Sequence, residues 1–220
     1  MRLLLLRHGQ THSNVSGALD TGAPGADLTE LGRAQADAAG TVLAERGVEA
    51  IYCSTLVRTH QTAAPLATRL GITPVTFDGV REVAAGDLEM RTDMDSATGY
   101  RHVVGTWLLE RNLDLCMPGA EDGHAFLARY DAAVDSILAS GHDTAVLVSH
   151  GAAIRTWVGL RNTGDIEPWR EHALGPLHNT GCIEMEYDGA WRIVDWHNDP
   201  VGGHLLDDPS APDPTAESPA

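Results

Sequence analysis

The sequence has few cysteines and no long apolar run, and each shortage excludes a class of protein. Its three cysteines show no CxxC spacing, so neither a disulfide framework nor a zinc site is expected, and a reducing, cytoplasmic location is favoured. No window approaches the roughly 20 apolar residues of a membrane-spanning helix, so no membrane association is expected. The four leucines at 3–6 are too few for a signal-peptide core, because Arg7 and His8 follow them directly.

Positive charge is also scarce. The 220 residues include 15 arginines and no lysine, against 31 aspartates and glutamates, which gives a formal net charge of -16 at pH 7. Nucleic acids and anionic membranes both require a basic surface, so neither is expected as a partner. A protein this acidic can bind a phosphate only if it gathers its few arginines at one place, so the positions of the arginines are informative.

Strand and helix patterns alternate along the chain, which predicts an α/β fold, a three-layer sandwich with a mostly parallel central sheet flanked by helices. Apolar runs and an Asp-Gly hairpin signal predict strands over 2–6, 50–54, 73–77, 144–148, 182–187 and 191–196. Capping residues and alanine-rich stretches predict helices over 29–47, 56–70, 98–112 and 121–139, and a further helix from Gly151. Pro65 is expected to kink or break the second helix.

The length is enough for one domain, which we place at residues 1–201. Residues 202–220 are rich in proline, aspartate, serine and alanine. Such a composition buries too little apolar surface to offset the entropy of ordering, so this segment is predicted to be a disordered tail.

One short pattern, an apolar strand that ends in His-Gly, occurs twice. The two copies are Leu3–Leu6 followed by Arg7-His8-Gly9, and Val146–Val148 followed by Ser149-His150-Gly151. In open α/β sheets, ligands collect at the carboxyl ends of strands, and helices that begin there direct N–H groups toward anions. We therefore expect His8 and His150 to face one site.

Transfer of a phosphoryl group needs fixed positive donors, a nucleophile that is neutral at pH 7, and an acid for the leaving oxygen. Arginine, imidazole and a carboxylic acid meet these needs without a metal. Five segments resemble, in family order, motifs of the histidine phosphatase superfamily, in the branch that includes cofactor-dependent phosphoglycerate mutase. They are R-H-G-x-T-x-x-N at 7–14, L-T-x-x-G-x-x-Q-A at 28–36, S-x-L-x-R-x-x-Q-T-A at 54–63, R-E-x-x-x-G-x-x-E at 81–89 and V-x-H-G at 148–151.

The resemblance spans residues 2–196 and implies a role for each matching residue. His8 attacks phosphorus and becomes a phosphohistidine, while Glu82 protonates the leaving oxygen and then activates water. The residues implied to bind the phosphoryl group and the substrate are Arg7, Asn14, Thr21, Gly22, Arg58, His150 and Gly151. Two arginines beside Glu82 should lower its pKa in the free protein, so its acid role is expected to develop only when phosphate is bound.

The family includes phosphatases and mutases, which share the phosphohistidine and differ in the group that accepts the phosphoryl. Mutases of this type carry a long insertion between the acid and the second histidine, whereas Glu82 and His150 are only 68 positions apart. Hydrolysis of a small phosphorylated metabolite, without metal or other cofactor, is therefore the preferred hypothesis. A mutase and a phosphate-binding regulatory module without turnover remain as alternatives. Departures from the family pattern at 86–90 and 118–122 make substrate preference the open question.

Other phosphatase chemistries fit the sequence poorly. A cysteine phosphatase needs Cys-x5-Arg, and only four residues separate Cys53 from Arg58. The segment 93–95 has the Asp-x-Asp spacing of an aspartate nucleophile, but no apolar strand precedes it, so a solvated loop is expected. No HxH or HExxH metal motif is present. The two last predicted strands could form an edge-to-edge homodimer.

Overall fold

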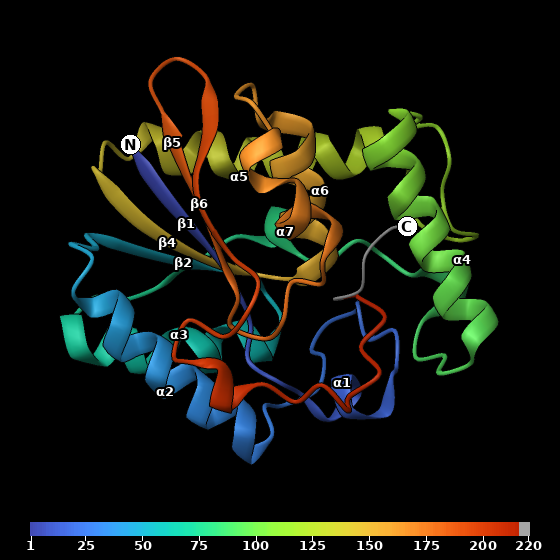
Figure 1. Ribbon diagram of the computed structural model, residues 1–220, viewed down its shortest axis with the longest axis horizontal. Coiled ribbons are helices and arrows are strands. Elements are labelled where there is room, and N and C mark those ends of the chain that lie inside the picture. Colours follow the sequence, from blue (N-terminus) through green and yellow to red (C-terminus); the bar gives the residue numbers. More distant parts are fainter. Residues whose placement is uncertain (216–220) are drawn as a thin grey trace.

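The computed structural model describes residues 1–215, and its centre is a six-stranded mixed sheet (Figure 1). The strands lie in the order β3-β2-β4-β1-β5-β6. Their bounds are β1 Arg2–Arg7, β2 Ala50–Cys53, β3 Val75–Thr76, β4 Thr144–Ser149, β5 Cys182–Tyr187 and β6 Trp191–His197. The first four strands run parallel to one another, and the hairpin adds two antiparallel pairings, β1–β5 and β5–β6. The predicted fold class is confirmed.

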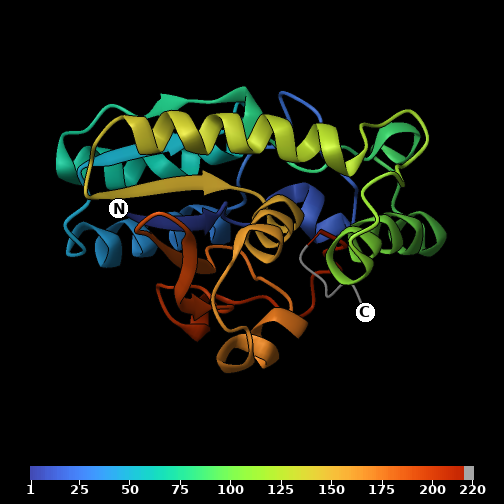
Figure 2. The same ribbon diagram turned by 90° about the horizontal axis from the view of Figure 1, so that it is seen from above.

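Helices cover both faces of this sheet, with α2 and α3 on one face and α5 and α6 on the other (Figures 1 and 2). The α-helices are α1 His12–Ser16, α2 Glu30–Ala44, α3 Val57–Leu70, α4 Met94–Gly105, α5 Gly123–Ala139, α6 Gly151–Arg161 and α7 Arg170–Leu174. Shorter turns are η1 Asp78–Val80, η2 Gly86–Leu88, the π-helical η3 Thr106–Glu110, η4 Glu167–Trp169 and η5 His204–Leu206. No helix within residues 1–215 is both long and apolar enough to cross a membrane.

Strand β1 explains why the sheet needs helices on both sides. Its leucines alternate between two cores, with Leu3 and Leu5 facing α5 and α6, and Leu4 and Leu6 facing α2 and α3. All four are at most 2% exposed. The continuous apolar run therefore forms a strand buried on both faces, as the sequence predicted.

Two helices differ from their predictions. Helix α3 continues through Pro65, which was expected to kink or break it. Tight packing on α2 stabilises it there, since a Cβ atom on Gly40 would lie 3.2 Å from the Pro65 Cβ. Helix α4 starts at Met94, earlier than the predicted residue 98, because the Asp93 side chain accepts the Ser96 N–H as an N-cap. It ends at Gly105, where the π-helical turn η3 begins.

The C-terminal residues also depart from prediction as far as the structure describes them. Disorder was expected over 202–220, yet the turn η5 forms within this stretch, and Asp213 and Thr215 are each 8% exposed. The stretch follows the molecular surface past α2 and α1 toward α4 (Figure 1). Composition misses this result because polar contacts with a preformed surface, and not an apolar core, position these residues. Residues 216–220 of the predicted tail lie outside the described residues.

Candidate active site

The two His-Gly sequences meet at the carboxyl end of the sheet. Strands β1 and β4 are adjacent and parallel, with Arg7 opposite Ser149, so the next residue of each strand, His8 or His150, leaves the sheet at the same level. Both histidines are buried, and their ring centroids lie 5.2 Å apart. The structure therefore brings the two histidines together, and their facing of one phosphate site stays a prediction.

The His8 imidazole is prepared to act as a neutral base or nucleophile. Its Nδ1 lies 2.8 Å from the Gly9 carbonyl oxygen, which can only accept a hydrogen bond, so Nδ1 carries the proton and Nε2 keeps its lone pair. Burial, then the charges of Arg58 and Arg7, lower the pKa of His8 well below its ordinary value. The ring is therefore neutral at neutral pH, as a nucleophile must be.

The His150 imidazole is held by a hydroxyl from the neighbouring strand. Its Nε2 lies 2.8 Å from Ser54 Oγ, and Ser54 follows directly after β2. Ser54 Oγ also accepts the Leu56 N–H and lies 3.2 Å from Thr59 Oγ1, so these contacts hold the ring in place in either tautomer. Nδ1 is buried without a hydrogen-bond partner among the described residues, so it is the ring nitrogen left to bind a ligand.

Two buried arginines bring positive charge to the histidines. Arg7 Nη1 donates to the Leu177 carbonyl oxygen at 2.7 Å, and its Nη2 forms an ion pair with Asp213. Arg58 Nη2 donates to the Asp20 carbonyl oxygen at 2.8 Å, and its Nη1 lies 3.6 Å from the Asp20 carboxylate. Arg7 Nε, Arg58 Nε and Arg58 Nη1 have no hydrogen-bond partner among residues 1–215. Buried guanidinium groups with unused donors form a site for an anion.

Glu82 lies against the first turn of α6. One carboxylate oxygen accepts the N–H groups of Val83 and Ala153, both at 2.8 Å, and the other accepts Ala152 N–H at 3.3 Å. Gly151, the first residue of α6, thus links the second histidine to the turn that binds this carboxylate. The helix N-terminus positions an acid beside the anion site.

The pKa of Glu82 corrects one expectation. The arginines were expected to lower it in the free protein, but burial raises the pKa above its ordinary value and outweighs the opposing effects. Those effects are the hydrogen bonds from Val83 and Ala153, followed by the charges of Arg58 and Arg7. Because the carboxylate is 2% exposed, loss of hydration is the larger contribution, and a phosphate is not needed to make the group more basic.

Three further predicted residues already have partners within the protein. The Asn14 side-chain oxygen accepts the Thr11 N–H at 2.9 Å and so completes the capping box of α1. The backbone N–H groups of Thr21 and Gly22 both donate to Glu89 at 2.9 Å, and the Thr21 hydroxyl donates to the same carboxylate. Contact of Asn14, Thr21 and Gly22 with substrate stays a prediction.

Sequence reasoning did not single out three residues that shape the site. Ser54 belongs to a recognised motif and directly follows a strand, so its place at the sheet edge was a usable signal. Asp20 has no such signal, because only the folded loop brings it to Arg58. Asp213 lies in a stretch whose composition predicted disorder, which concealed its contact with Arg7.

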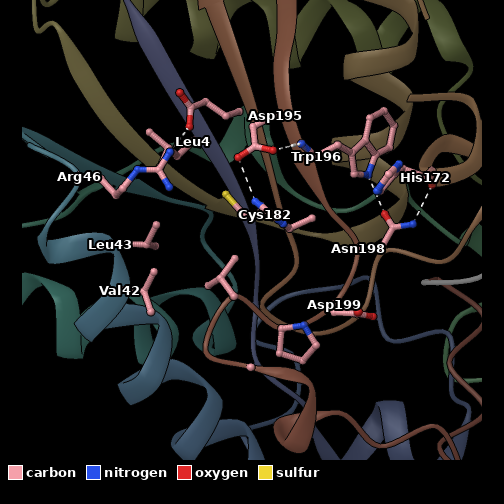
Figure 3. A pocket seen from close by; sticks show the side chains of 15 residues that line it. Leu4, Val42, Leu43, Arg46, His172, Cys182, Asp195, Trp196, Asn198 and Asp199 are labelled. Atoms are coloured by element: carbon pink, nitrogen blue, oxygen red, sulfur yellow. Dashed lines mark hydrogen bonds and ion pairs between the residues drawn. The ribbon is translucent and has the colours of Figure 1, made fainter. Parts of the chain in front are cut away.

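The described residues contain no group of three or more histidine, cysteine, aspartate or glutamate side chains arranged to hold a metal ion. A separate cavity of about 290 Å³ lies between α2 and the β5–β6 hairpin (Figure 3). Its lining includes Cys182, Asp195 and Trp196 but none of the predicted site residues. The buried Glu184 of this region forms ion pairs with Arg2 and Arg46, at 2.5 Å each. Its charge is therefore neutralised within the protein and serves the structure.

A neutral imidazole beside two buried arginines, at the carboxyl end of a mostly parallel sheet, defines an α/β protein of the phosphate-handling class. Comparison with known families agrees with this class and narrows it to one superfamily. The chain belongs to the histidine phosphatase superfamily (branch 1), whose family model matches residues 3–199.

Individual relatives include phosphatases and proteins named as mutases. The chain is 34% identical over 217 residues to the PE-PGRS family protein PE_PGRS11 of Mycobacterium tuberculosis, covering 90% of this chain and 36% of that longer protein. It is 32% identical over 202 residues to the probable phosphoglycerate mutase GpmB of Yersinia pestis, covering 89% and 90% of the two chains. A solved mycobacterial glucosyl-3-phosphoglycerate phosphatase matches with a TM-score of 0.72 and 30% identity, over 89% of this chain and 98% of that one.

Proposed function

We propose that this protein hydrolyses a small phosphomonoester through a phosphohistidine at His8, without a metal ion. The observation that carries the proposal is the His8 ring, whose Nδ1 is fixed by Gly9 and whose Nε2 keeps its lone pair beside the positive charges of Arg7 and Arg58. The names of the relatives support a small phosphorylated metabolite as the substrate, because the solved mycobacterial neighbour is a glucosyl-3-phosphoglycerate phosphatase.

The proposed reaction has two steps. In the first, His8 Nε2 forms a bond to phosphorus, the bond from phosphorus to the leaving oxygen breaks, and the Glu82 carboxyl gives its proton to that oxygen. In the second, water attacks phosphorus, Glu82 accepts a proton from the water, and the N–P bond breaks to release inorganic phosphate. Each step returns Glu82 to the state that the other step needs.

The remaining residues are proposed to bind the phosphoryl oxygens in both steps. Arg7 and Arg58 supply charged donors, and His150 is proposed to donate from Nδ1, which has no partner among the described residues. Because these donors are buried and fixed before the substrate arrives, their stabilisation of the charged transition state needs little reorganisation. The N–H of Gly151, at the start of α6, and the Asn14 carboxamide are proposed to contribute further hydrogen bonds.

Hydrolysis of p-nitrophenyl phosphate in the presence of EDTA tests the proposal. We expect the wild-type activity to persist, His8→Ala to abolish it, and a phosphoenzyme labile to acid to be trapped only with His8 present. His12→Ala is the matched control, because His12 is an exposed histidine in the adjacent helix α1. Turnover that survives in His8→Ala, or activity that EDTA removes and a divalent metal restores, would contradict the mechanism.

A mutase remains the second candidate, because GpmB is named as a probable phosphoglycerate mutase. Mutase activity requires the site to retain a bisphosphate while its phosphoryl acceptor changes. Between Glu82 and His150 the chain forms α4, η3, α5 and β4, so this segment holds no long insertion that could close over such an intermediate. Interconversion of 3- and 2-phosphoglycerate primed by 2,3-bisphosphoglycerate, at a rate above that of hydrolysis, would favour the mutase instead.

A further inference from the structure

The C-terminal segment, defined as residues 207–215, lies directly on the proposed phosphoryl site. Asp213 forms an ion pair with Arg7, and the Thr215 hydroxyl accepts a hydrogen bond from the same Nη2 at 3.3 Å. The Thr215 carbonyl oxygen lies over the start of α6, since a Cβ atom on Gly151 would be 2.6 Å from it. A carboxylate and a carbonyl oxygen thus lie where phosphoryl oxygens are expected.

Contacts along the rest of the segment position it there. Asp207 pairs with His178 at 3.1 Å, and Asp208 accepts a hydrogen bond from Gln10 at 2.8 Å. Gly17 leaves room for the backbone of Pro212, because a Cβ atom at position 17 would lie 2.8 Å from the Pro212 oxygen. Gln10 and Gly17 belong to the segment after β1 that also carries predicted site residues, whereas His178 lies in the loop before β5, so the docking uses two separate loops.

The charge of Asp213 reaches both phosphate-binding arginines. Burial lowers the pKa of Arg58, and the charges of Asp20 and Asp213 are among those that oppose the shift. The local turn fixes the orientation of the carboxylate, because its Oδ1 accepts the Thr215 N–H at 3.2 Å and the Thr215 hydroxyl at 2.9 Å, which leaves Oδ2 for Arg7. Asp213 thus occupies Nη2 on the edge of the guanidinium group that also carries Nε, which has no partner among the described residues, so a phosphoryl group cannot bind both donors of that edge while Asp213 is in place.

We propose that Asp213 is an intramolecular competitor for the phosphoryl group, so that the C-terminal segment determines which phosphomonoesters reach His8. This inference rests on the proposed function, because both assign Arg7 to the phosphoryl group. A substrate binds both donors of this Arg7 edge only when the segment leaves it, so the apparent affinity falls in proportion to the fraction of molecules in the open form. Dianionic phosphomonoesters whose leaving groups make further contacts displace Asp213 from Arg7 most effectively, and small anions displace it poorly.

The test compares two variants of the full-length chain that lose one negative charge each. Asp213→Asn keeps the Oδ1 acceptor for Thr215 but turns an amide toward Arg7, whereas Asp114→Asn removes an exposed carboxylate on the loop between η3 and α5. Inorganic phosphate binding is measured by calorimetry, and KM and kcat are measured with p-nitrophenyl phosphate. The melting temperature of each variant shows that it is folded, and Asp213→Ala provides a second substitution at the same position.

We expect Asp213→Asn and Asp213→Ala to bind inorganic phosphate about ten-fold more tightly than wild type and to lower KM by a similar factor, with kcat changed less than about two-fold. Asp114→Asn should match wild type in all three quantities. Phosphate binding by Asp213→Asn equal to that by Asp114→Asn, or weaker, overturns the proposal. Calorimetry separates the two hypotheses, because tighter phosphate binding in a chain without turnover would contradict the proposed hydrolysis and leave the competitor role standing.

Discussion

Replacing Glu82 by glutamine tests the proposed acid most directly. The substitution keeps the size of the side chain and both hydrogen bonds to one oxygen, from Val83 and Ala153 at 2.8 Å. It places an amide against Ala152 N–H, where the carboxylate accepted a bond at 3.3 Å. Loss of that long bond costs about 1 kcal/mol of folding free energy, partly offset because a buried carboxylate no longer has to be desolvated. The variant should therefore fold.

The catalytic loss should be much larger and should depend on the leaving group. General acid catalysis contributes about 10²- to 10⁴-fold, which corresponds to roughly 3–5 kcal/mol of transition-state stabilisation. An alkyl phosphate such as glycerol phosphate releases a strongly basic oxygen, so Glu82→Gln should lower its kcat/KM by this full factor. With p-nitrophenyl phosphate the leaving phenolate needs little protonation, so its kcat/KM should fall about ten-fold or less.

The pH profile gives an independent measurement of the same group. Because burial raises the pKa of Glu82, the protonated acid persists to higher pH than an ordinary glutamate, and kcat/KM for the alkyl phosphate should fall as pH rises through that pKa. Glu82→Gln should lose this limb of the profile. Glu186→Gln, an exposed glutamate of β5, is the matched control. Equal losses for the two substrates, or a limb retained in Glu82→Gln, would refute the assignment of Glu82 as the acid.

Two further predictions concern the orientation of His150 and the core. Ser54→Ala removes the 2.8 Å hydrogen bond to His150 Nε2. The kcat/KM for p-nitrophenyl phosphate should then fall about ten-fold, which corresponds to the free energy of one ordinary hydrogen bond. Ser54→Thr keeps the hydroxyl and should recover part of this loss. An unchanged kcat/KM in Ser54→Ala would mean that His150 needs no such support. Leu5→Ala removes a fully buried side chain from the central strand and should lower the free energy of unfolding, measured in urea, by about 2–5 kcal/mol. Leu109→Ala, at a 65% exposed position, is the control and should change that free energy by less than about 0.5 kcal/mol.

Much of the fold and the centre of the site could be read from local patterns. A run of leucines long enough for one strand and apolar at every position predicts burial on both faces, and β1 has that burial. Two strand–His–Gly sequences predict two histidines at one sheet edge, because parallel strands end together. These predictions succeed because they depend on short-range periodicity and on a rule of topology that holds for most open α/β sheets.

Contacts between distant segments were decided only by the tertiary structure. The raised pKa of Glu82 could not be read from neighbouring arginines, because burial against α6 outweighs their charges. Continuation of α3 through Pro65 depends on packing against α2. The docking of the C-terminal segment follows from one buried arginine meeting a carboxylate 206 positions away. The sequence by itself determined which groups could carry phosphate chemistry, and the folded surface decided which of them are solvated, shielded or already occupied.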